Sequence, residues 1–531
     1  MATCGEVLVQ LLDSQGVDTV FGIPGVHTVE LYRGLPNSRL RHVTPRHEQG
    51  AGFMADGYAR ATGKVAACFI ITGPGLTNIT TPMAQAYGDS VPMLVISSVN
   101  HSWELGLGEG RLHELPNQRN LMAGVSAFSH TLMRPDELPN VLARAFAVFR
   151  SARPRPVHIE MPLDVITANA DHLPRRLPMI GGRPAPDPKL VAEAAGLLKD
   201  AKRPLVAFGG GAQDAGVAAL RLVEALGAPA ALTINAKGLL PRDHPLNLGS
   251  TLPQNAVQAE LAAADVLLAV GTEIGETDWV FGGDPVIKGK LIRVDIDPEQ
   301  IARNHLPEIG IVGDAAVTLD ALADALEGAR PRTDGPKRTK AMKEAALAEL
   351  NPAYQKHRKI LAAVKEALPG VIVVGDSTQP IYSGNVFYDA DAPRSWFNSA
   401  TGYGTLGYAL PAALGARLGQ PERPVVALIG DGGLQFTIGE LSTAAELGLP
   451  VIVLLWNNRG YKEIKRYMAD RDIPQIGVDI YTPDFQTIAK GFGLAAAKAG
   501  SLVELDKLLK KAAKANGPTL IEIDEAQALD W

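Results

Sequence analysis

The segment between residues 425 and 458 constrains the fold of this chain most, because it reads as a strand, a helix and a second strand. Residues 425–429 form a short apolar run that stops at a glycine-rich turn, as a buried parallel strand does. Residues 437–448 are typical of a helix, and residues 451–456 of the next strand. A right-handed connection of this kind places the carboxyl ends of both strands at one edge of a sheet, where open α/β sheets bind ligands.

Two side chains that carry oxygen, Asp431 and Asn458, directly follow these strands, so we expect them to share that edge. Together with the backbone carbonyl of Gly460 they suit Mg²⁺, which prefers octahedral oxygen coordination and often completes it with phosphate oxygens. Glycines around Asp431 let a diphosphate approach the backbone, and the helix start beyond them favours negative charge. These glycines are Gly430, Gly432 and Gly433. Asp-Gly or Asn-Asn alone is more typical of a turn or a loop, but their pairing across an intact strand-helix-strand unit favours the ligand site.

This pairing of Gly-Asp-Gly with Asn-Asn resembles the thiamine diphosphate (ThDP) motif of one enzyme family. The family contains acetolactate synthase, pyruvate oxidase, benzoylformate decarboxylase and pyruvate decarboxylase. The resemblance covers nearly the whole chain and implies ThDP and Mg²⁺ as cofactors, with Tyr461 beside the metal ligands. It also implies a homodimer or homotetramer whose active sites lie between subunits.

Two linkers divide the chain into three parts. Residues 168–189 are rich in Pro, Gly and Arg, and residues 329–340 are charged and contain two prolines. Strand and helix patterns alternate in all three parts, which predicts an α/β protein with three doubly wound parallel-sheet domains. With the names that the resemblance implies, they are a pyrimidine-binding domain (1–168), a central Rossmann-like domain (190–328) and a diphosphate-binding domain (345–531). The run Gly209-Gly210-Gly211 is a weak dinucleotide signal, because it lacks the G-x-G-x-x-G spacing and a tight strand-to-helix turn explains it.

Composition excludes several classes of protein. The chain of 531 residues has 51 basic and 57 acidic residues and no basic stripe, so nucleic acid is not an expected partner. The amino terminus lacks the pattern of a signal peptide, and no apolar run has the length of a transmembrane helix. Cys4 and Cys68 form neither a disulfide framework nor a metal-binding spacing. Both therefore read as reduced thiols of a cytoplasmic protein.

ThDP enzymes of this family need a carboxylate that hydrogen-bonds the pyrimidine ring, so that the amino group of the ring can deprotonate the thiazolium carbon. The stretch Arg46-His47-Glu48-Gln49-Gly50-Ala51 matches the corresponding family pattern, and Glu48 is the candidate carboxylate. A glutamate at a helix is usually part of a solvated face. Here, however, the next helical turns consist of small residues, which suit close packing.

The family also bends the cofactor with a bulky aliphatic side chain and accepts a hydrogen bond from its amino group with a backbone carbonyl. Residues 401–408 match that stretch, which makes Leu406 the wedge and the carbonyl of Gly404 the acceptor. Without the other motifs, these residues would read as a glycine-rich loop followed by a helix at residues 410–418.

Subfamily assignment depends on loops that depart from the well-known members. After Pro24-Gly25 the chain has Val26, where decarboxylases carry Asp or Ser, and His27 is the nearest titratable side chain. In the loop at residues 108–116, His113 is a candidate general acid-base, although a loop histidine is more often a surface residue. The catalytic glutamate of the decarboxylases aligns with Ile464, so Glu463 is rotated from that position by about 100° on a helix and is expected to line the substrate pocket. The full set of candidate substrate residues is Val26, His27, His113, Glu114, Glu463 and Tyr467.

The first domain resembles bacterial 5-guanidino-2-oxopentanoate (2-ketoarginine) decarboxylases. A guanidinium substrate needs a carboxylate partner, and Glu463, Glu114 and Glu109 are the candidates. The favoured function is the non-oxidative decarboxylation of a 2-oxo acid to an aldehyde, with the capability to join two carbonyl compounds. One alternative is an acetolactate-synthase-like carboligase acting on pyruvate, which would bind FAD in the middle domain; FAD is not expected otherwise. The other is a catalytically silent binding protein, against which the joint presence of Glu48, Asp431 and Asn458 argues.

Overall fold

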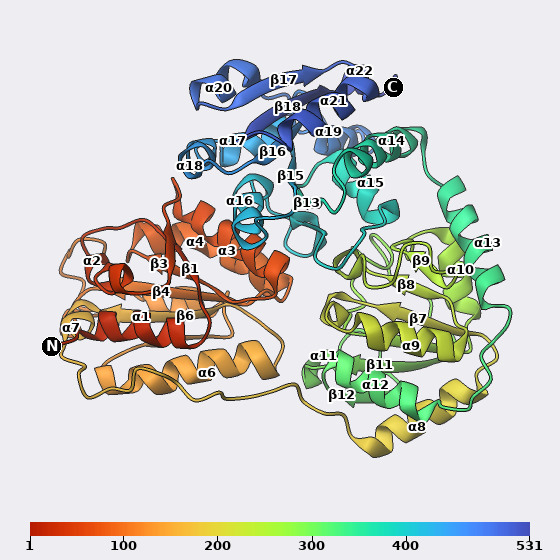
Figure 1. Ribbon diagram of the computed structural model, residues 1–531, viewed down its shortest axis with the longest axis horizontal. Coiled ribbons are helices and arrows are strands. Elements are labelled where there is room, and N and C mark those ends of the chain that lie inside the picture. The colour runs from red at the N-terminus through yellow and green to blue at the C-terminus, as the bar shows by residue number, and fades with distance from the viewer.

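The computed structural model describes all 531 residues and contains three six-stranded sheets in which every strand pairing is parallel. The first sheet, red to orange in Figure 1, has the order β2-β1-β3-β4-β6-β5. Its strands are β1 (Thr19–Gly22), β2 (Arg41–Val43), β3 (Ala66–Ile70), β4 (Met93–Val99), β5 (Phe128–Thr131) and β6 (Val157–Pro162). The α-helices are α1 (Cys4–Ser14), α2 (Val29–Tyr32), α3 (Glu48–Thr62), α4 (Pro74–Gly88), α5 (Gln118–Ala123), α6 (Leu138–Ser151) and α7 (Leu163–Thr167).

Strand β3 shows why helices cover both faces of this sheet. All of its residues are buried, and successive side chains point to opposite faces. Ala66, Cys68 and Ile70 belong to the hydrophobic core under α3 and α4. Ala67 and Phe69 belong to a second core, under α1 and α6. A strand buried on both faces reads as a continuous apolar run in the sequence, as residues 66–70 do.

The second sheet, yellow to green in Figure 1, has the order β12-β11-β10-β7-β8-β9. Its strands are β7 (Pro204–Phe208), β8 (Ala230–Leu232), β9 (Asn247–Gly249), β10 (Val266–Val270), β11 (Lys290–Asp295) and β12 (Ile309–Val312). The α-helices are α8 (Pro188–Asp200), α9 (Gly216–Leu226), α10 (Asn255–Ala263), α11 (Pro298–Ala302), α12 (Ala315–Ala325) and α13 (Gly335–Ala348).

The third sheet, in the teal-to-blue part at the top of Figure 1, has the order β14-β13-β15-β16-β18-β17. Its strands are β13 (Ile372–Gly375), β14 (Trp396–Asn398), β15 (Val425–Gly430), β16 (Val451–Asn457), β17 (Ala495–Ala499) and β18 (Thr519–Asp524). The α-helices are α14 (Pro352–Ala367), α15 (Gln379–Phe387), α16 (Ala409–Gly419), α17 (Asp431–Phe436), α18 (Glu440–Leu447), α19 (Lys462–Ala469), α20 (Phe485–Gly491), α21 (Leu502–Ala512) and α22 (Glu525–Ala528).

The predicted α/β fold class with three parallel sheets is confirmed. Two local expectations differ from the structure. The helix expected at residues 437–448 is α18, but a further short helix, α17, precedes it, so that Asp431 itself occupies the first turn of a helix. The second half of the linker at residues 329–340 is helical, because α13 begins at Gly335 with a proline in its first turn, where the missing N–H needs no partner.

The domain boundaries remain predictions. The three sheets lie inside residues 1–168, 190–328 and 345–531, and the linker at residues 168–187 contains no helix or sheet strand. Residue 345 falls within α13, whose Met342 and Ala346 belong to a core of the second unit. None of the helices combines the length and the apolar character that are needed to cross a lipid bilayer.

Helices α3 and α16 join the first unit to the third, because one hydrophobic core of 44 residues contains side chains from both. The two helices approach closely through glycines. A methyl group at Gly57 of α3 would overlap the backbone of Ala412, and one at Gly415 of α16 would overlap the backbone of Met54. Glycine is therefore required at both positions for the helices to pack at this distance.

We expect Gly57→Ala to destabilise the contact between the first and third units by about 3 kcal/mol, the upper end of the cost of overpacking a core. Thermal unfolding followed by calorimetry should show a midpoint several degrees lower. Gly196→Ala is the matched control, because Gly196 lies in α8 with open space around it. That change should be neutral or stabilising, since alanine favours helix. A wild-type midpoint for Gly57→Ala would contradict the close packing of α3 and α16.

Candidate active site

Three oxygen atoms meet at the carboxyl ends of β15 and β16, which pair in parallel. Asn458 Oδ1 lies 3.1 Å from Asp431 Oδ1 and 2.9 Å from the carbonyl oxygen of Gly460. Adjacent oxygens around an octahedral Mg²⁺, with bonds of about 2.1 Å, lie about 3 Å apart. The distances from Asn458 Oδ1 to the other two oxygens are therefore those of neighbouring ligands in such a coordination shell. We call Asp431, Asn458 and Gly460 the oxygen cluster.

The orientation of the Asn458 amide supports this assignment. Its Nδ2 donates to Gln379 Oε1 over 3.3 Å, which leaves Oδ1 facing the other two oxygens. Reversing the amide would pair its nitrogen with Asp431 and Gly460 but would set its oxygen against Gln379 Oε1. Without a cation, Asn458 Oδ1 would face two other acceptor oxygens, and the reversed amide would be preferred. A cation bound between the three oxygens would remove that repulsion, so that the amide could keep its present orientation.

Asp431 is held rigidly. Its Oδ2 accepts hydrogen bonds from the N–H of Gly460 (2.9 Å) and from Thr482 Oγ1 (3.3 Å), and its Oδ1 accepts one from the N–H of Asn458 (3.3 Å). Burial raises the pKa of Asp431 although these bonds act in the opposite direction. A buried carboxylate is stabilised in its charged form by a nearby cation. No group of three His, Cys, Asp or Glu side chains offers a different kind of metal centre.

The glycines of this turn are required by the packing of the protein itself. A methyl group at Gly432 would lie 2.7 Å from the ring of Tyr461, and one at Gly433 would lie 3.0 Å from the carboxylate of Asp376. Asp376 follows β13, and burial raises its pKa to about 6. The close approach of a diphosphate, for which the sequence analysis invoked these glycines, remains a prediction.

Glu48 is the first residue of α3 and points at the start of α4. Its Oε2 accepts a hydrogen bond of 3.0 Å from Asn78 Nδ2, and its Oε1 lies beside Gly75. The loop before Glu48 is fixed by the third unit. Glu440, at the first residue of α18, accepts hydrogen bonds from the N–H groups of Arg46 (3.0 Å) and His47 (3.2 Å). The third unit therefore determines where α3, and with it Glu48, begins.

His27 and His113 stack on one another although they are far apart in the sequence. Their ring centroids are 5.1 Å apart, with 26° between the ring planes. The Nδ1 atoms of both rings are buried without a hydrogen-bond partner. Burial, followed by the neighbouring His113, lowers the pKa of His27, so that His27 is neutral at pH 7 and can accept a proton. The carbonyl of His113 faces Gly73, next to the turn that holds Glu48.

The loop carboxylates of the first unit are occupied by local partners. Glu114 accepts hydrogen bonds from the N–H groups of Gly108 (2.8 Å), Gly110 (2.9 Å) and Arg111 (3.0 Å). Glu109 forms an ion pair with Arg111. These contacts favour a structural role for Glu114 in shaping its own loop. Val26, at the other candidate loop, is 74% exposed.

Glu463 lies on the same sheet edge as the oxygen cluster. Its Oε2 accepts a hydrogen bond of 3.5 Å from Gln379 Nε2, and Gln379 Oε1 in turn contacts Asn458. Its other oxygen pairs with Arg466, one turn further along α19. Tyr467 is 53% exposed, and the guanidinium of Arg471 lies 3.4 Å from its ring centre.

Gly404 and Leu406 lie in the loop between β14 and α16. Gly404 has φ +80°, in the left-handed region, with open space around it, and Leu406 is half-buried. Thr437, which follows α17, donates from Oγ1 to the carbonyl of Gly407 over 2.8 Å. The loop is therefore adjacent to the helix that begins at Asp431.

Within one chain the candidate residues form two separate groups. Glu48, His27 and His113 lie at the carboxyl edge of the first sheet, whereas the oxygen cluster, Gly404, Leu406 and Glu463 lie at that of the third. No hydrogen bond joins the carboxylate of Glu48 to the oxygen cluster.

Three further residues contact the candidate residues and were not predicted from the sequence: Gln379, Asn78 and Glu440. Gln379 could have been found, because it follows the apolar strand β13 and polar residues after a parallel strand mark a ligand edge. Asn78 and Glu440 carry no such signal. Their contacts depend on how helices of distant segments pack.

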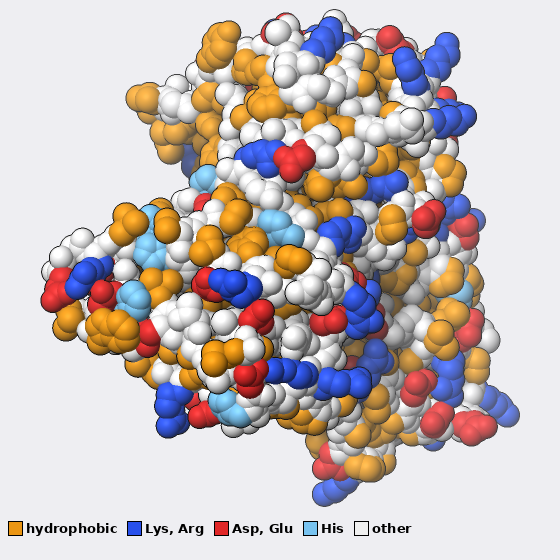
Figure 2. All heavy atoms as spheres, turned by 60° about the vertical axis from the view of Figure 1, so that its left-hand side comes forward, with side chains coloured by type: hydrophobic (Ala, Val, Ile, Leu, Met, Phe, Trp, Pro, Cys, Tyr) orange, Lys and Arg blue, Asp and Glu red, His pale blue; other side chains and the backbone are white.

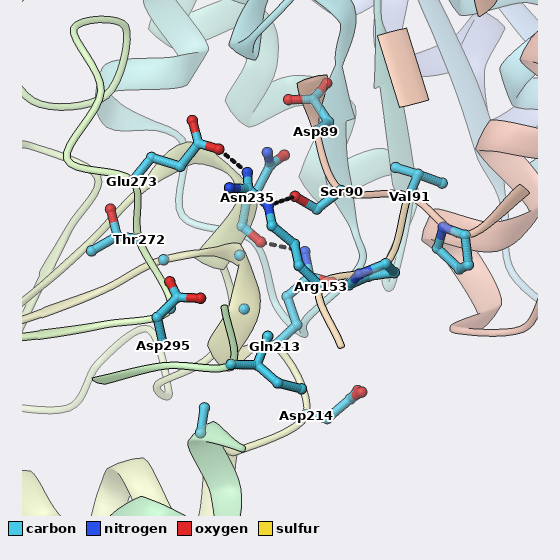
Figure 3. Close-up of a pocket in the computed structure, with 18 of the residues that line it drawn as sticks. Asp89, Ser90, Val91, Arg153, Gln213, Asp214, Asn235, Thr272, Glu273 and Asp295 are labelled. Carbon is cyan, nitrogen blue, oxygen red and sulfur yellow. Dashed lines mark hydrogen bonds and ion pairs between the residues drawn. The ribbon is translucent and has the colours of Figure 1, made fainter. Parts of the chain in front are cut away.

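A cavity of about 560 Å³ lies elsewhere, where the three units meet. Its lining includes the carboxyl ends of β7, β10 and β11, with the Gly209–Gly211 turn and Asp295. Figure 3 shows Arg153 reaching into this space, where it pairs with Glu273 and donates to Ser90. The cavity is distinct from the oxygen cluster and contains none of its residues.

Comparison with known proteins gives consistent matches along the chain. Residues 2–121 match a family model described as thiamine pyrophosphate enzyme, N-terminal TPP binding domain, residues 191–322 match the central domain, and residues 376–523 match the C-terminal TPP binding domain. The chain is 48% identical to the "Probable 2-ketoarginine decarboxylase AruI" of Pseudomonas aeruginosa, over 99% of this chain and 94% of that protein. It is 33% identical to the "Acetolactate synthase large subunit" of Corynebacterium glutamicum, over 98% and 86%. The X-ray structure of a putative thiamin diphosphate-dependent enzyme from Mycobacterium smegmatis superimposes with a TM-score of 0.84 and 26% identity, over 98% of this chain and 99% of that one.

Proposed function

The chain belongs to the thiamine pyrophosphate enzyme family, and we propose that it is a Mg²⁺-dependent decarboxylase that converts 5-guanidino-2-oxopentanoate to the corresponding aldehyde. The observation that carries the proposal is the oxygen cluster, in which Asn458 Oδ1 lies 3.1 and 2.9 Å from the other two oxygens, beside a glycine-rich helix start. The substrate is suggested by the Pseudomonas relative. As a member of this family the chain is a ThDP-dependent enzyme, so the silent binding protein is set aside.

We assign the two ends of ThDP to the two groups of residues. Asp431, Asn458 and the carbonyl of Gly460 would hold Mg²⁺ and, through it, the diphosphate. Leu406 would support the bend of the cofactor, and the carbonyl of Gly404 would accept a hydrogen bond from its amino group. Glu48 would hydrogen-bond the pyrimidine ring.

When bound, ThDP supplies a carbon nucleophile for the 2-oxo group and an electron sink for the departing CO₂. The residues of the chain would hold and transfer the protons that this chemistry requires. Glu48 holds a proton at the pyrimidine ring. His27, neutral because of burial, and its stacked neighbour His113 would exchange protons with the substrate oxygen and carbon.

The two groups of residues are brought together in a homodimer. Large hydrophobic side chains are exposed in segments that follow the carboxyl ends of strands in both units, and such surfaces mark interaction sites. They include Val26 and Leu112 of the first unit and Tyr403, Ile464 and Tyr467 of the third. Figure 2 shows hydrophobic side chains and histidines on the first unit, on the side that faces the third. A two-fold axis would set the first unit of one copy against the third unit of its partner. A measurement of the molar mass in solution would distinguish this dimer from a homotetramer, which is the alternative prediction.

Glu463 is our candidate partner for the substrate guanidinium. It is linked to Asn458 through Gln379, and its present partner is itself a guanidinium, that of Arg466. A carboxylate that already pairs with arginine can pair in the same way with a guanidino acid. Glu114 is less suitable, because three backbone N–H groups occupy its oxygens.

We expect Glu463→Gln to raise KM for 2-ketoarginine roughly tenfold to a thousandfold, the range for removing one partner of a desolvated ion pair. KM for 2-oxobutyrate, which carries no charge at that end, should change little. Steady-state kinetics on both acids measure the contrast, and Glu299→Gln, which removes the carboxylate of an exposed ion pair with Arg303, is the control. Equal losses on both acids would place Glu463 in the chemistry instead of in substrate recognition.

The proposed function is tested by the release of CO₂ from a panel of 2-oxo acids with and without ThDP and Mg²⁺. A higher rate of CO₂ release from 2-ketoarginine than from the uncharged acids would support the proposed function. Turnover of other 2-oxo acids only would end the guanidino-acid assignment.

A second candidate is an acetolactate-synthase-like carboligase acting on pyruvate. The 33% identical relative and the cavity beside the Gly209–Gly211 turn favour it, because this alternative requires FAD in the middle domain. The absorption spectrum of the purified protein tests for flavin, and analysis of the products of pyruvate turnover tests for acetolactate. We place the protein in the cytoplasm, since both cysteines are unpaired and buried.

A further inference from the structure

The loop at residues 401–408 is anchored by side chains of the first unit. Thr401 donates from Oγ1 to Asp89 Oδ1 over 2.9 Å. Thr405 donates to Gln85 Oε1 twice, from Oγ1 over 3.0 Å and from its backbone N–H over 3.4 Å. Gln85 lies in α4, fully buried, and Asp89 directly follows that helix. Helix α4 of one unit therefore fixes a loop of another.

The bond to the Thr405 N–H has a geometric consequence for Gly404. In a planar trans peptide the N–H and the preceding C=O point in opposite directions. The peptide that joins Gly404 to Thr405 has its N–H directed at Gln85, so its carbonyl, which belongs to Gly404, is directed away from α4. Gly404 alone does not fix this plane, because it has φ +80° and open space around it.

The orientation of the Gln85 amide is itself determined. Its Nε2 donates to Asp89 Oδ2 over 2.6 Å, so its Oε1 must face Thr405. Asp89 is held in turn by the guanidinium of Arg60, which donates to it over 2.7 Å and to Asp56 over 2.6 Å. Asp56, Arg60 and Gln85 are all buried, so no solvent competes for these bonds. Asp89 is labelled in Figure 3 and also lines the cavity of about 560 Å³ where the three units meet.

We propose that Gln85 is a positioning residue that aims the Gly404 carbonyl at the amino group of the cofactor's pyrimidine. The proposal rests on the proposed function, because it takes Gly404 as the acceptor. Gln85 acts through a single peptide plane and does not touch the cofactor. The hydroxyl of Thr405 donates a second hydrogen bond to Gln85 Oε1 and so helps to hold this oxygen against the Thr405 N–H.

Gln85→Met tests the proposal, because methionine fills the same volume without accepting a hydrogen bond. In protein without cofactor, exchange of the Thr405 amide hydrogen should become faster. In protein loaded with ThDP and Mg²⁺, kcat should fall roughly tenfold to hundredfold, as for a misplaced catalytic contact. KM for the 2-oxo acid and calorimetric ThDP affinity should stay near wild type, since substrate and diphosphate contacts are intact. The near-ultraviolet circular dichroism of the bound pyrimidine should change.

A folded Gln85→Met variant with wild-type kcat and wild-type dichroism would overturn the proposal. If Gln85→Met does not fold, Thr405→Val decides, because it removes only the Oγ1 donor. Its kcat and dichroism should then change in the same direction, and Thr405→Ser, which keeps the donor, should restore both. Wild-type values for Thr405→Val in that case would overturn the proposal.

Failure of the proposed function is a separate result. It would appear in the wild-type protein, as no ThDP binding or no decarboxylation, before any variant is compared. Exchange of the Thr405 amide is measured without cofactor, so it tests the bond to Gln85 in either case.

Discussion

Replacing Glu48 with glutamine is expected to abolish turnover while leaving the fold and the assembly intact. The structure places this carboxylate at the start of α3, half-buried, with Asn78 as its only side-chain hydrogen-bond donor. Glutamine keeps the shape but cannot take up or hold a proton at the pyrimidine ring. The loss of a group that transfers a proton in this way is expected to lower kcat roughly 10²- to 10⁴-fold. Steady-state decarboxylation by the variant, saturated with ThDP and Mg²⁺, measures the effect.

Glu30→Gln is a suitable control for the Glu48 variant. Glu30 also lies in the first turn of a helix, but it forms a surface ion pair with Arg33 over 2.7 Å. Surface pairs contribute little to stability, so this change should leave both kcat and the unfolding midpoint unaltered. Decarboxylation by Glu48→Gln at near wild-type rate would show that another group activates the cofactor.

Replacing Asp431 with alanine is expected to eliminate Mg²⁺-dependent ThDP binding. Asp431 supplies the only negative charge of the oxygen cluster, because Asn458 and the carbonyl of Gly460 are neutral. Breaking a buried ion contact costs roughly 3–5 kcal/mol, which corresponds to two to four orders of magnitude in affinity. Calorimetric titration with ThDP, at fixed Mg²⁺ and again with chelator, measures the loss.

Thr482→Val provides the graded comparison for Asp431→Ala. It removes one hydrogen bond to Asp431 Oδ2 and leaves the carboxylate in place. A single neutral donor contributes about 1 kcal/mol, so affinity should fall by less than about tenfold. Unchanged ThDP affinity in Asp431→Ala would remove the metal-site assignment, whatever the activity of the variant.

The sequence predicted the elements of the site that depend on local pattern. Buried parallel strands read as continuous apolar runs, so the strand before Asp431 and the strand before Asn458 were placed within one residue of their observed ends. Because parallel strands end at one edge, the closeness of these two side chains followed from the pattern alone. The backbone N–H of Asn458 donates to Asp431 Oδ1 over 3.3 Å, so the two residues do lie side by side at that edge.

Other contacts of the candidate site could not be predicted in this way. His27 stacks on His113, Glu440 holds the backbone before Glu48, and Gln85 holds Thr405. Each pair joins segments that are remote in the sequence. The order of the strands in a sheet and the docking of α3 on α16 bring them together.

The sequence by itself determined the three α/β units and the choice of candidate residues for the chemistry, because the period of the hydrophobic residues and the polar residues at strand ends are local properties of the sequence. The tertiary structure alone decided how those residues are oriented. The direction of the Asn458 amide depends on Gln379, and that of the Gly404 carbonyl depends on Gln85. Side-chain and peptide orientations are set by hydrogen bonds between distant segments, and those bonds exist only after the helices have packed.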